Sequence, residues 1–233
     1  PCERVDGRRL FKALMTPDGA VVLEIAVEGE GAWCRTHTAV RSSPDSMALL
    51  HGASLRMLGL TSDVASFESR AHQDANIANL VAQRKGLRVP LIATNFDALC
   101  WAIIGQQINV KFAASLRREI FVLAGIPAEC GMRAHPDPAR VADLDPSMLA
   151  ARRFSRQKID YLTGAAREAA EGRLDVEDLT AGSARAAEKK LTAVRGIGTW
   201  TARYVLLRGG FGDSAPVGDA ALAHLGHLVV DGK

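Results

Sequence analysis

The feature that most constrains the fold is a long apolar helical period that begins at Asn95. Apolar side chains recur there every three or four residues, at Phe96, Leu99, Cys100, Ile103, Ile104, Ile108, Phe112, Leu116 and Ile120. Asn95 is a favourable N-cap, and the period predicts one long, mostly buried helix. Inside it, the stretch from Gly105 to Asn109 places three polar amides next to a glycine. A purely structural core helix carries aliphatic residues at such positions, so we expect a polar partner to meet this point.

The residues before this helix indicate a small sheet. Two strand-like runs, residues 11–15 and 21–27, flank the turn Thr16-Pro-Asp-Gly19, which is typical of an antiparallel hairpin. Short helical periods follow between residues 44 and 83 and are expected to pack on the sheet. We therefore expect an amino-terminal α+β domain with an antiparallel sheet over residues 1–90.

The residues after the apolar period are predicted to be mostly helical. A proline-rich linker comes first. Three helical segments follow it: a short one that starts at Asp145, a longer one over residues 156–171 and a third over residues 183–194. The expected fold class is α+β, mostly α. A small antiparallel sheet packed on helices is followed by a helical domain over residues 91–233.

Composition disfavours several classes of protein. The 233 residues carry a net charge of +3 and are 48% hydrophobic, as in a soluble globular chain. No apolar run approaches the roughly 20 residues that cross a bilayer, and the amino end is too charged for a secretory signal, so no membrane partner and a cytoplasmic location are expected. The cysteines at positions 2, 34, 100 and 130 form no C-x-x-C pair, which disfavours a disulfide framework, a zinc site and an iron–sulfur cluster.

Two glycines one residue apart, Gly196 and Gly198, lie between two helical segments. They permit a tight turn, and the backbone N–H groups that open the second helix can bind an anion such as a phosphate. Residues 151–210 hold 12 Lys or Arg against 7 Asp or Glu, which suits a surface that faces phosphates. A structural helical corner without a partner stays open as the alternative.

A glycine-rich loop follows and ends at Asp219, at the start of a last predicted helix. Taken alone, an aspartate in that position is an N-cap. Asp219 comes 21 residues after Gly198, which is enough for one helix and a returning loop. This spacing would place its carboxylate near whatever the glycine turn holds.

The pattern L-x-x-V-x-G-I-G-x-W-T-A over residues 191–202, followed by P-V-G-D-x-x-L over residues 216–222, resembles the helix-hairpin-helix DNA glycosylase superfamily. Within that superfamily it is most similar to the bacterial 3-methyladenine DNA glycosylase II group. The stretch Ile-Gly-Gln-Gln-Ile-Asn-Val-Lys-Phe-Ala-Ala over residues 104–114 resembles the helix that precedes the hairpin in the same family.

The resemblance implies a base-excision repair enzyme that flips an alkylated base, such as 3-methyladenine, out of duplex DNA and hydrolyses its N-glycosidic bond. Asp219 would stabilise the oxocarbenium-like sugar and the attacking water. Trp200 and Tyr204, one helical turn apart, would stack on the base. Bifunctional relatives carry a lysine where this chain has Trp200, so a monofunctional enzyme without lyase activity is expected.

The resemblance also implies how the DNA is held. Five residues of the hairpin would bind the DNA backbone: Arg195, Gly196, Gly198, Thr199 and Thr201. Gln107, or else Gln106, would act as the wedge that fills the gap left by the flipped base, and a pair of amides satisfied inside the protein is an equal alternative. No cofactor is expected apart from a monovalent cation on backbone carbonyls of the hairpin turn, no side-chain metal site is expected, and a monomer is the default.

Two other functions stay open at this point. A non-catalytic helix-hairpin-helix module would use the hairpin for phosphates only, and then Asp219→Asn would change nothing. A glycosylase for another lesion would act on uracil, a mismatched thymine or adenine opposite an oxidised guanine. The aromatic hairpin and the lack of a four-cysteine pattern argue against that second function. The resemblance implies further helices beyond Lys233 that close the base pocket.

Overall fold

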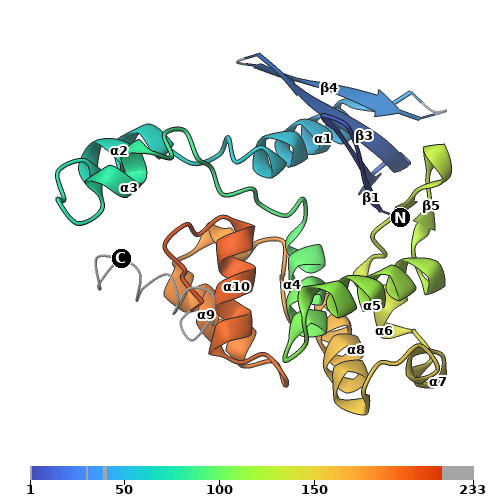
Figure 1. Cartoon of the computed structure of the whole chain (residues 1–233). Coiled ribbons are helices and arrows are strands. Elements are labelled where there is room, and N and C mark those ends of the chain that lie inside the picture. Colours follow the sequence, from blue (N-terminus) through green and yellow to red (C-terminus); the bar gives the residue numbers. More distant parts are fainter. Residues whose placement is uncertain (1, 30, 39–40, 217–233) are drawn as a thin grey trace.

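The computed structural model of the chain describes residues 2–29, 31–38 and 41–216. It begins with a four-stranded antiparallel sheet and continues as helices (Figure 1). The strands are neighbours in chain order: β1 (Glu3–Asp6), β2 (Arg9–Thr16), β3 (Gly19–Glu28) and β4 (Gly31–His37). The predicted hairpin is confirmed, because Thr16 pairs with Gly19 across the turn between β2 and β3.

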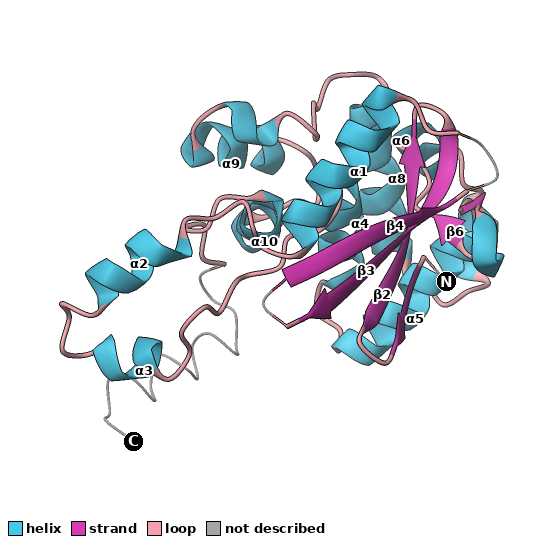
Figure 2. Ribbon diagram, turned by 90° about the horizontal axis from the view of Figure 1, so that it is seen from above, coloured by secondary structure: helices cyan, strands magenta, loops and turns pink. Residues whose placement is uncertain are grey.

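Both faces of the sheet carry buried apolar side chains. One face packs against α1 (Pro44–Met57), as Figure 2 shows, through Leu14, Val21, Leu23, Ile25, Leu50 and Ala53. The opposite face packs against a short hairpin of β5 (Ile126–Pro127) and β6 (Arg133–Ala134), through Phe11, Ala13, Val22, Met132 and Ala134. The sheet is therefore a middle layer between α1 and a segment that comes well after residue 90.

Two helices, α2 (Val64–Ala71) and α3 (Ala78–Ala82), extend away from the sheet (Figures 1 and 2). The helices predicted between residues 44 and 83 are present, but the expectation that they all pack on the sheet is wrong for these two. Within both described helices only Ala71 is buried. They are too short to present an apolar face of the kind that α1 lays on the sheet.

The helical domain is built around α4 (Asn95–Gly105), in which nine residues are buried. The prediction of one long helix is wrong, because the chain turns at residues 106–109 and then forms α5 (Val110–Leu123). Gln107 has a φ of 56°, which a right-handed helix does not allow. The Asn109 side chain accepts a hydrogen bond from the Phe112 N–H and so caps α5. The apolar period runs across the break because both helices bury side chains in the same core.

The N-cap of α4 also differs from the prediction. Thr94 is the cap, and its side chain accepts a hydrogen bond from the Asp97 N–H. Asn95 is the first helical residue, and its side-chain amide donates to the carbonyls of Val176 and Glu177. Asn95 therefore fixes α4 to a distant loop instead of capping the amino end of α4.

The rest of the helical domain comprises α6 (Pro138–Ala142), α7 (Pro146–Ala150), α8 (Arg156–Ala170), α9 (Ala184–Thr192) and α10 (Thr199–Gly209), with single 3₁₀ turns at Glu129–Gly131 and Leu179–Ala181. The three predicted helical segments are confirmed as α7, α8 and α9, and their N-caps are Asp145, Ser155 and Ser183. Among the helices of the described ranges, none is long and apolar enough to span a membrane.

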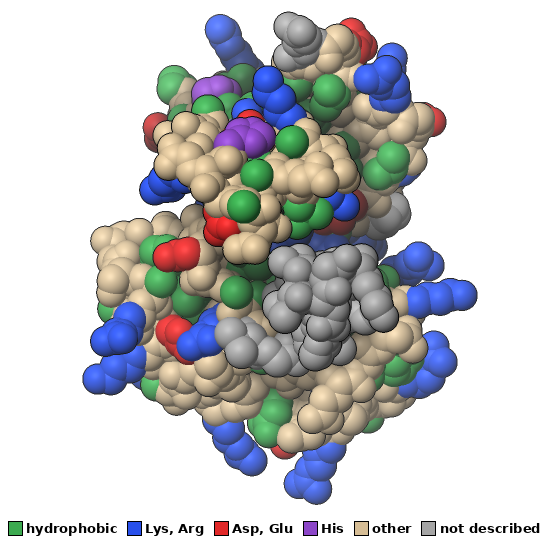
Figure 3. Space-filling view, turned by 60° about the vertical axis from the view of Figure 1, so that its left-hand side comes forward, with side chains coloured by type: hydrophobic (Ala, Val, Ile, Leu, Met, Phe, Trp, Pro, Cys, Tyr) green, Lys and Arg blue, Asp and Glu red, His purple; other side chains and the backbone are tan. Residues whose placement is uncertain are grey.

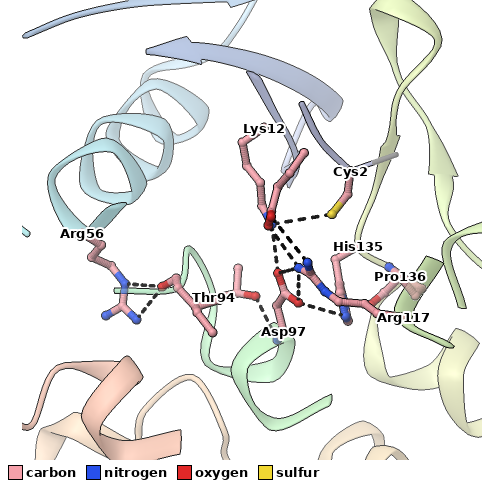
Figure 4. A network of polar contacts seen from close by, with 10 residues as sticks. Cys2, Lys12, Arg56, Thr94, Asp97, Arg117, His135 and Pro136 are labelled. Atoms are coloured by element: carbon pink, nitrogen blue, oxygen red, sulfur yellow. Dashed lines mark hydrogen bonds and ion pairs between the residues drawn. The ribbon is translucent and has the colours of Figure 1, made fainter. Parts of the chain in front are cut away.

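A buried charge cluster, made of Glu3, Lys12, Asp97, Arg117 and His135, joins the sheet to the helical domain (Figure 4). Lys12 Nζ on β2 lies 2.9 Å from Asp97 Oδ2 on α4, and the two side chains are only 2% and 1% exposed. Arg117 Nη2 on α5 lies 2.8 Å from the same oxygen. Glu3 on β1 completes the cluster with Oε1 2.6 Å from Lys12 Nζ.

The groups of the cluster set one another's protonation. Burial by itself raises the pKa of Asp97, but Lys12, His135 and Arg117 hold that pKa well below its ordinary value. Burial likewise raises the pKa of Glu3, and Lys12 and Arg117 more than reverse the effect, lowering it to about 2. Burial lowers the pKa of His135. Near pH 7 the cluster therefore consists of two carboxylates, two cations and a neutral imidazole.

Breaking the cluster should destabilise the protein. Asp97→Asn leaves the Lys12 ammonium buried without its main countercharge, and we expect it to lower the free energy of unfolding by about 3 kcal/mol. The exposed pair Arg140–Asp137 is the control, because removing it with Arg140→Ala should cost under about 1 kcal/mol. Urea unfolding followed by circular dichroism measures both variants. Equal small losses would show that the buried pair does not hold the two parts together.

The lowered pKa of Asp97 predicts that the free energy of unfolding depends on pH. The pKa of Asp97 is depressed in the folded chain, so its contribution to stability is present above an unfolded-state pKa of about 4 and decreases as the pH falls below that value. Between about pH 5 and pH 3, the wild type should lose stability more steeply than Asp97→Asn. Parallel slopes of unfolding free energy against pH would contradict the assignment.

Candidate functional site

The glycine hairpin predicted between two helices is present, between α9 and α10. Gly196 has a φ of 88°, and a Cβ there would collide with the ring of Tyr161 on α8. Both the backbone conformation and the packing therefore require glycine at this position. Gly198 is different, because its backbone is extended and a Cβ would meet nothing within 4 Å.

The amino end of α10 is open. Gly198 is its N-cap and supplies no side-chain hydrogen bond, so the first backbone N–H groups of the helix have no capping side chain. Gly198, Thr199 and Arg195 are exposed. The helix dipole adds partial positive charge at this end. Lys and Arg side chains project around the lower part of the molecule in Figure 3. An exposed helix terminus of this kind suits a phosphate group.

Thr201, one of the residues predicted to bind the DNA backbone, points its side chain into the protein. Its side chain is 3% exposed, and its Oγ1 accepts a hydrogen bond of 3.0 Å from Gln106 Nε2. The same amide nitrogen donates to the carbonyl of Gly196 at 2.9 Å. The Thr201 side chain therefore supports the hairpin from inside the protein, and the contact of this residue with the DNA backbone stays a prediction.

The two glutamines of the α4–α5 turn have different positions. Gln106 is tied to the hairpin by the bonds just described, which matches the alternative of an amide satisfied inside the protein. Gln107 is exposed and holds the left-handed backbone conformation that non-glycine residues rarely adopt. A residue held in such a conformation at a surface turn is a candidate for a functional contact.

Lys158 on α8 is a site residue that the sequence did not reveal. Its Nζ donates to the carbonyl of Gln106 at 2.7 Å and lies 3.4 Å from the carbonyl of Ile103, so it closes the carboxyl end of α4. Burial lowers the pKa of Lys158. The lysine was hidden among the basic residues of the segment, and only its helix-end contact distinguishes it.

Three aromatic side chains lie together beside the hairpin. The rings of Trp200 and Tyr204 stack with centroids 5.5 Å apart and an interplanar angle of 23°. Trp101 Nε1 on α4 donates a hydrogen bond of 2.9 Å to the Tyr204 hydroxyl. Trp101 lies inside the apolar helical period, so the sequence gives no separate signal for its role. The hydrogen bond fixes the Tyr204 ring relative to α4.

A cavity of about 620 Å³ lies between the sheet and the helical domain, next to Tyr204. Its lining includes Lys12, Met57, Trp101, Arg117, Tyr204 and Arg208. We call it the Tyr204 cavity. Its size is within the range of pockets that hold small molecules, and it combines aromatic walls with charged groups.

Three further predictions concern Asp219, a metal site and the cysteines. Asp219 lies outside the described residues. Within residues 2–29, 31–38 and 41–216, no three His, Cys, Asp or Glu side chains come close enough to hold a metal ion. Cys2 and Cys100 are buried thiols, while Cys34 and Cys130 are exposed.

The sequence matches one known protein family over more than half of its length. A family model described as "HhH-GPD superfamily base excision DNA repair protein" matches residues 100–228, more than half of the chain. The chain belongs to the HhH-GPD superfamily. The match runs from the middle of α4 through the glutamine turn and the hairpin, and its range includes position 219.

Curated relatives carry glycosylase names. The DNA-3-methyladenine glycosylase of Bacillus subtilis is 37% identical over 169 residues, which are 71% of this chain and 56% of that protein. DNA-3-methyladenine glycosylase 2 of Escherichia coli is 34% identical over 135 residues, 57% of this chain and 47% of that protein. The HhH-GPD chain described here thus spans about half the length of these relatives.

Solved structures confirm the fold class. The 3-methyladenine DNA-glycosylase from Archaeoglobus fulgidus has a TM-score of 0.85 and 20% identity, and the match covers 99% of this chain and 78% of that one. The Mag1 3-methyladenine DNA glycosylase of Schizosaccharomyces pombe, solved with abasic DNA, has a TM-score of 0.57 and 22% identity over 77% of this chain and 80% of that one. The α+β, mostly helical fold predicted from the sequence is the fold of HhH-GPD glycosylases.

The two glycines of the HhH-GPD hairpin should respond differently to alanine. Gly196→Ala meets both the Tyr161 ring and a positive φ, so we expect it to lower the free energy of unfolding by about 2 kcal/mol. Gly198→Ala has room and an extended backbone, so its stability should stay within about 0.5 kcal/mol while the added methyl group weakens binding of duplex DNA. Urea unfolding and fluorescence anisotropy with a labelled duplex measure the two effects. A stable Gly196→Ala protein would contradict the packing argument.

Proposed function

We propose that the chain is a monofunctional DNA glycosylase that releases alkylated bases, such as 3-methyladenine, from duplex DNA. The observation that carries the proposal is α10, which combines an open amino end with the Trp200–Tyr204 stack. A phosphate site and an aromatic surface on one helix suit an extrahelical nucleotide. Membership of the HhH-GPD superfamily supports base excision, and the names of the curated relatives support the alkylated substrate.

Duplex DNA would bind first through its backbone. The N–H groups at Gly198 and Thr199 would donate to a phosphate, with Arg195 beside them, and the contact reads no sequence. Gln107, exposed on the neighbouring turn, would enter the duplex as the base leaves it. Gln106 and Lys158 hold the hairpin and the turn at a fixed separation, so the phosphate and the wedge contacts act together.

The flipped base would then stack against the aromatic side chains. A flat purine gains from contact with the faces of Trp200 and Tyr204, and an electron-poor alkylated purine gains more. Trp101 orients the Tyr204 ring through its hydrogen bond. The ring pair therefore supplies a stacking surface whose orientation is fixed by α4.

Asp219 would be the catalytic residue. As the bond between C1′ and the base nitrogen breaks, its electron pair leaves with the base and positive charge develops on the sugar. A nearby carboxylate stabilises that charge and accepts a proton from the water that adds to C1′. A cationic alkylated base leaves as a neutral molecule, so the step needs no general acid.

The remaining expectations complete the proposal. Lyase chemistry needs an amine that forms a Schiff base with the sugar, and Trp200 occupies the position at which bifunctional relatives have lysine. A monovalent cation on the hairpin carbonyls, a monomeric state and a cytoplasmic location are proposed on the resemblance and composition given above. No side-chain metal site takes part in the proposed chemistry.

The first test is release of free base from methylated duplex DNA by wild type and Asp219→Asn. We expect wild type to release base and to give strand breaks only after alkali. Asp219→Asn should bind the same duplex yet be slower by roughly 100- to 1,000-fold, because one preorganised electrostatic stabiliser is lost. Binding without release by wild type would favour a binding module, and nicks without alkali would overturn the monofunctional assignment.

A second test separates the two glutamines. Gln107→Ala should slow base release from a fully paired duplex by roughly tenfold, and have little effect on a lesion placed opposite a mismatch, where the flipping cost is smaller. Gln106→Ala should instead lower the free energy of unfolding by about 1–3 kcal/mol, since it leaves the Thr201 hydroxyl and the Gly196 carbonyl without their partner. Identical behaviour of the two variants would refute separate roles.

A further inference from the structure

A second residue with a left-handed backbone lies beside the α4–α5 turn. Among the described residues that are not glycine, Gln107, Cys130 and Arg153 have a positive φ, and that of Arg153 is 67°. Arg153 lies between α7 and α8, two residues before Ser155, which is the N-cap of α8. An arginine rarely adopts this conformation, because its Cβ crowds the backbone there, whereas glycine adopts it freely. Strained residues of this kind gather at functional sites.

The Arg153 side chain is held in place by an aromatic ring. Its Cζ lies 5.3 Å from the centroid of the Phe112 ring, on the first turn of α5. Arg153 is exposed, and its guanidinium has no hydrogen bond and no ion pair with any residue of the described ranges. Its neighbour Arg152 differs, because Arg152 Nε lies 3.0 Å from Glu119 Oε2. The contact with the ring fixes the Arg153 cation but gives its five N–H donors no oxygen acceptor.

This cation belongs to the surface that carries the proposed wedge. Phe112 lies in the first turn of α5, which begins directly after the turn that contains Gln107. Lys158 on the first turn of α8 donates to the Gln106 carbonyl of the same turn. The α4–α5 turn and the α7–α8 turn are therefore fastened together, and each presents one left-handed residue. Both turns lie at the lower end of the helical domain in Figure 1, beside the hairpin between α9 and α10.

A phosphate group is the ligand that suits the Arg153 side chain. A guanidinium binds a phosphate through two parallel N–H donors, and this contact requires no base edge. Duplex DNA carries one negative charge about every 1.7 Å along its axis, so a duplex lying on this surface brings phosphates past the guanidinium. Arg156, at the start of α8, is also exposed and has no ion pair within the described chain, so it adds positive charge there.

We infer that Arg153 binds a DNA phosphate next to the wedge residue Gln107 and gives the protein a second backbone contact, separate from that of the hairpin. The inference rests on the proposed function, because it adds a contact to the proposed complex with duplex DNA. The hairpin would hold one phosphate through backbone N–H groups, and Arg153 would hold another through its side chain. Two phosphates held at a fixed separation set the register of the duplex, so that Gln107 enters it at a defined base step.

The test uses the backbone conformation of Arg153. Arg153→Gly removes the guanidinium and the strain together, so its urea midpoint should equal or exceed that of wild type. Its affinity for a labelled duplex with one central abasic-site analogue should fall by about tenfold at low salt, and the slope of log K against log salt should be smaller by about 0.9. Arg153→Lys keeps the charge and loses the paired donors, so it should lose about threefold in affinity at an unchanged slope. Fluorescence anisotropy at several salt concentrations measures all three proteins.

The matched control is Arg70→Ala on α2. Arg70 is exposed and has no side-chain hydrogen bond or ion pair within the described residues, and α2 extends away from the sheet. This variant changes the net charge by the same amount as Arg153→Gly, and its salt slope should equal that of wild type.

A second measurement identifies the strand that Arg153 contacts. One neutral methylphosphonate linkage is moved along the strand with the abasic-site analogue and then along the opposite strand. One position should weaken binding by wild type about as much as Arg153→Gly does and should have no further effect on Arg153→Gly, because the same contact is already lost. If no position behaves in this way on either strand, Arg153 binds no DNA phosphate.

Wild-type affinity and slope in Arg153→Gly, or an equal change in Arg70→Ala, would overturn the inference. A lower urea midpoint in Arg153→Gly would assign Arg153 a structural role and overturn it as well. Failure of the proposed function has a separate signature. If wild type binds duplex DNA but releases no base, the glycosylase assignment fails, while the salt slope still decides the Arg153 contact. If wild type releases base and Arg153→Gly keeps the wild-type slope, only the Arg153 contact fails.

Discussion

The ion pair between Lys12 and Asp97 is the interaction on which the arrangement of the site depends. It joins a strand of the sheet to the first turn of α4, and both side chains are almost fully buried. A buried carboxylate without its cation is costly, so α4 has one position relative to the sheet that satisfies both groups. Arg117 on α5 binds the same carboxylate and extends the constraint to the next helix. The Tyr204 cavity is the space left between the parts that this cluster holds together.

The other end of α4 extends the constraint to the glycine hairpin between α9 and α10. Gln106, immediately after the last residue of α4, donates to the Gly196 carbonyl and to Thr201. Lys158 on α8 binds the Gln106 carbonyl, and Tyr161 on the same helix fills the space above Gly196. The polar partner predicted at the break in the apolar period is thus supplied by the hairpin itself, which Gln106 joins to α4. Its neighbour Gln107 is exposed and is the proposed wedge.

The sequence predicted the elements better than their connections. Hydrophobic periodicity, turn residues and N-cap residues predicted the β2–β3 hairpin and helices α7, α8 and α9, because these signals are local in sequence. The apolar period could not show the break between α4 and α5, since both helices bury their residues in one core and the period survives the turn. Thr201 was placed on the DNA side because its motif is adjacent to the exposed turn, and only the three-dimensional position of Gln106 shows that it faces inward.

The charge cluster and the lining of the cavity were beyond the sequence for a different reason. Lys12 and Asp97 are 85 residues apart, and a lysine in a strand reads as a solvated side chain until its neighbours are known. Arg208 is one of the 12 Lys or Arg residues between positions 151 and 210, and its spacing does not set it apart from the others. What distinguishes it is the lack of a partner within the described chain, and that is a property of the folded surroundings and not of spacing.

The geometry of α10 would let one helix serve both of the proposed contacts, with the DNA backbone and with the base. From Gly198 to Arg208 the helix rises about 15 Å, at about 1.5 Å per residue. A phosphate bound at the amino end therefore fixes where along the helix the attached nucleotide lies, with Trp200 and Tyr204 before Arg208. Gln106 holds the hairpin end of α10 to α4, and Trp101 holds Tyr204, midway along α10, to the same helix, so the proposed backbone contact and base contact would be set by one pair of helices.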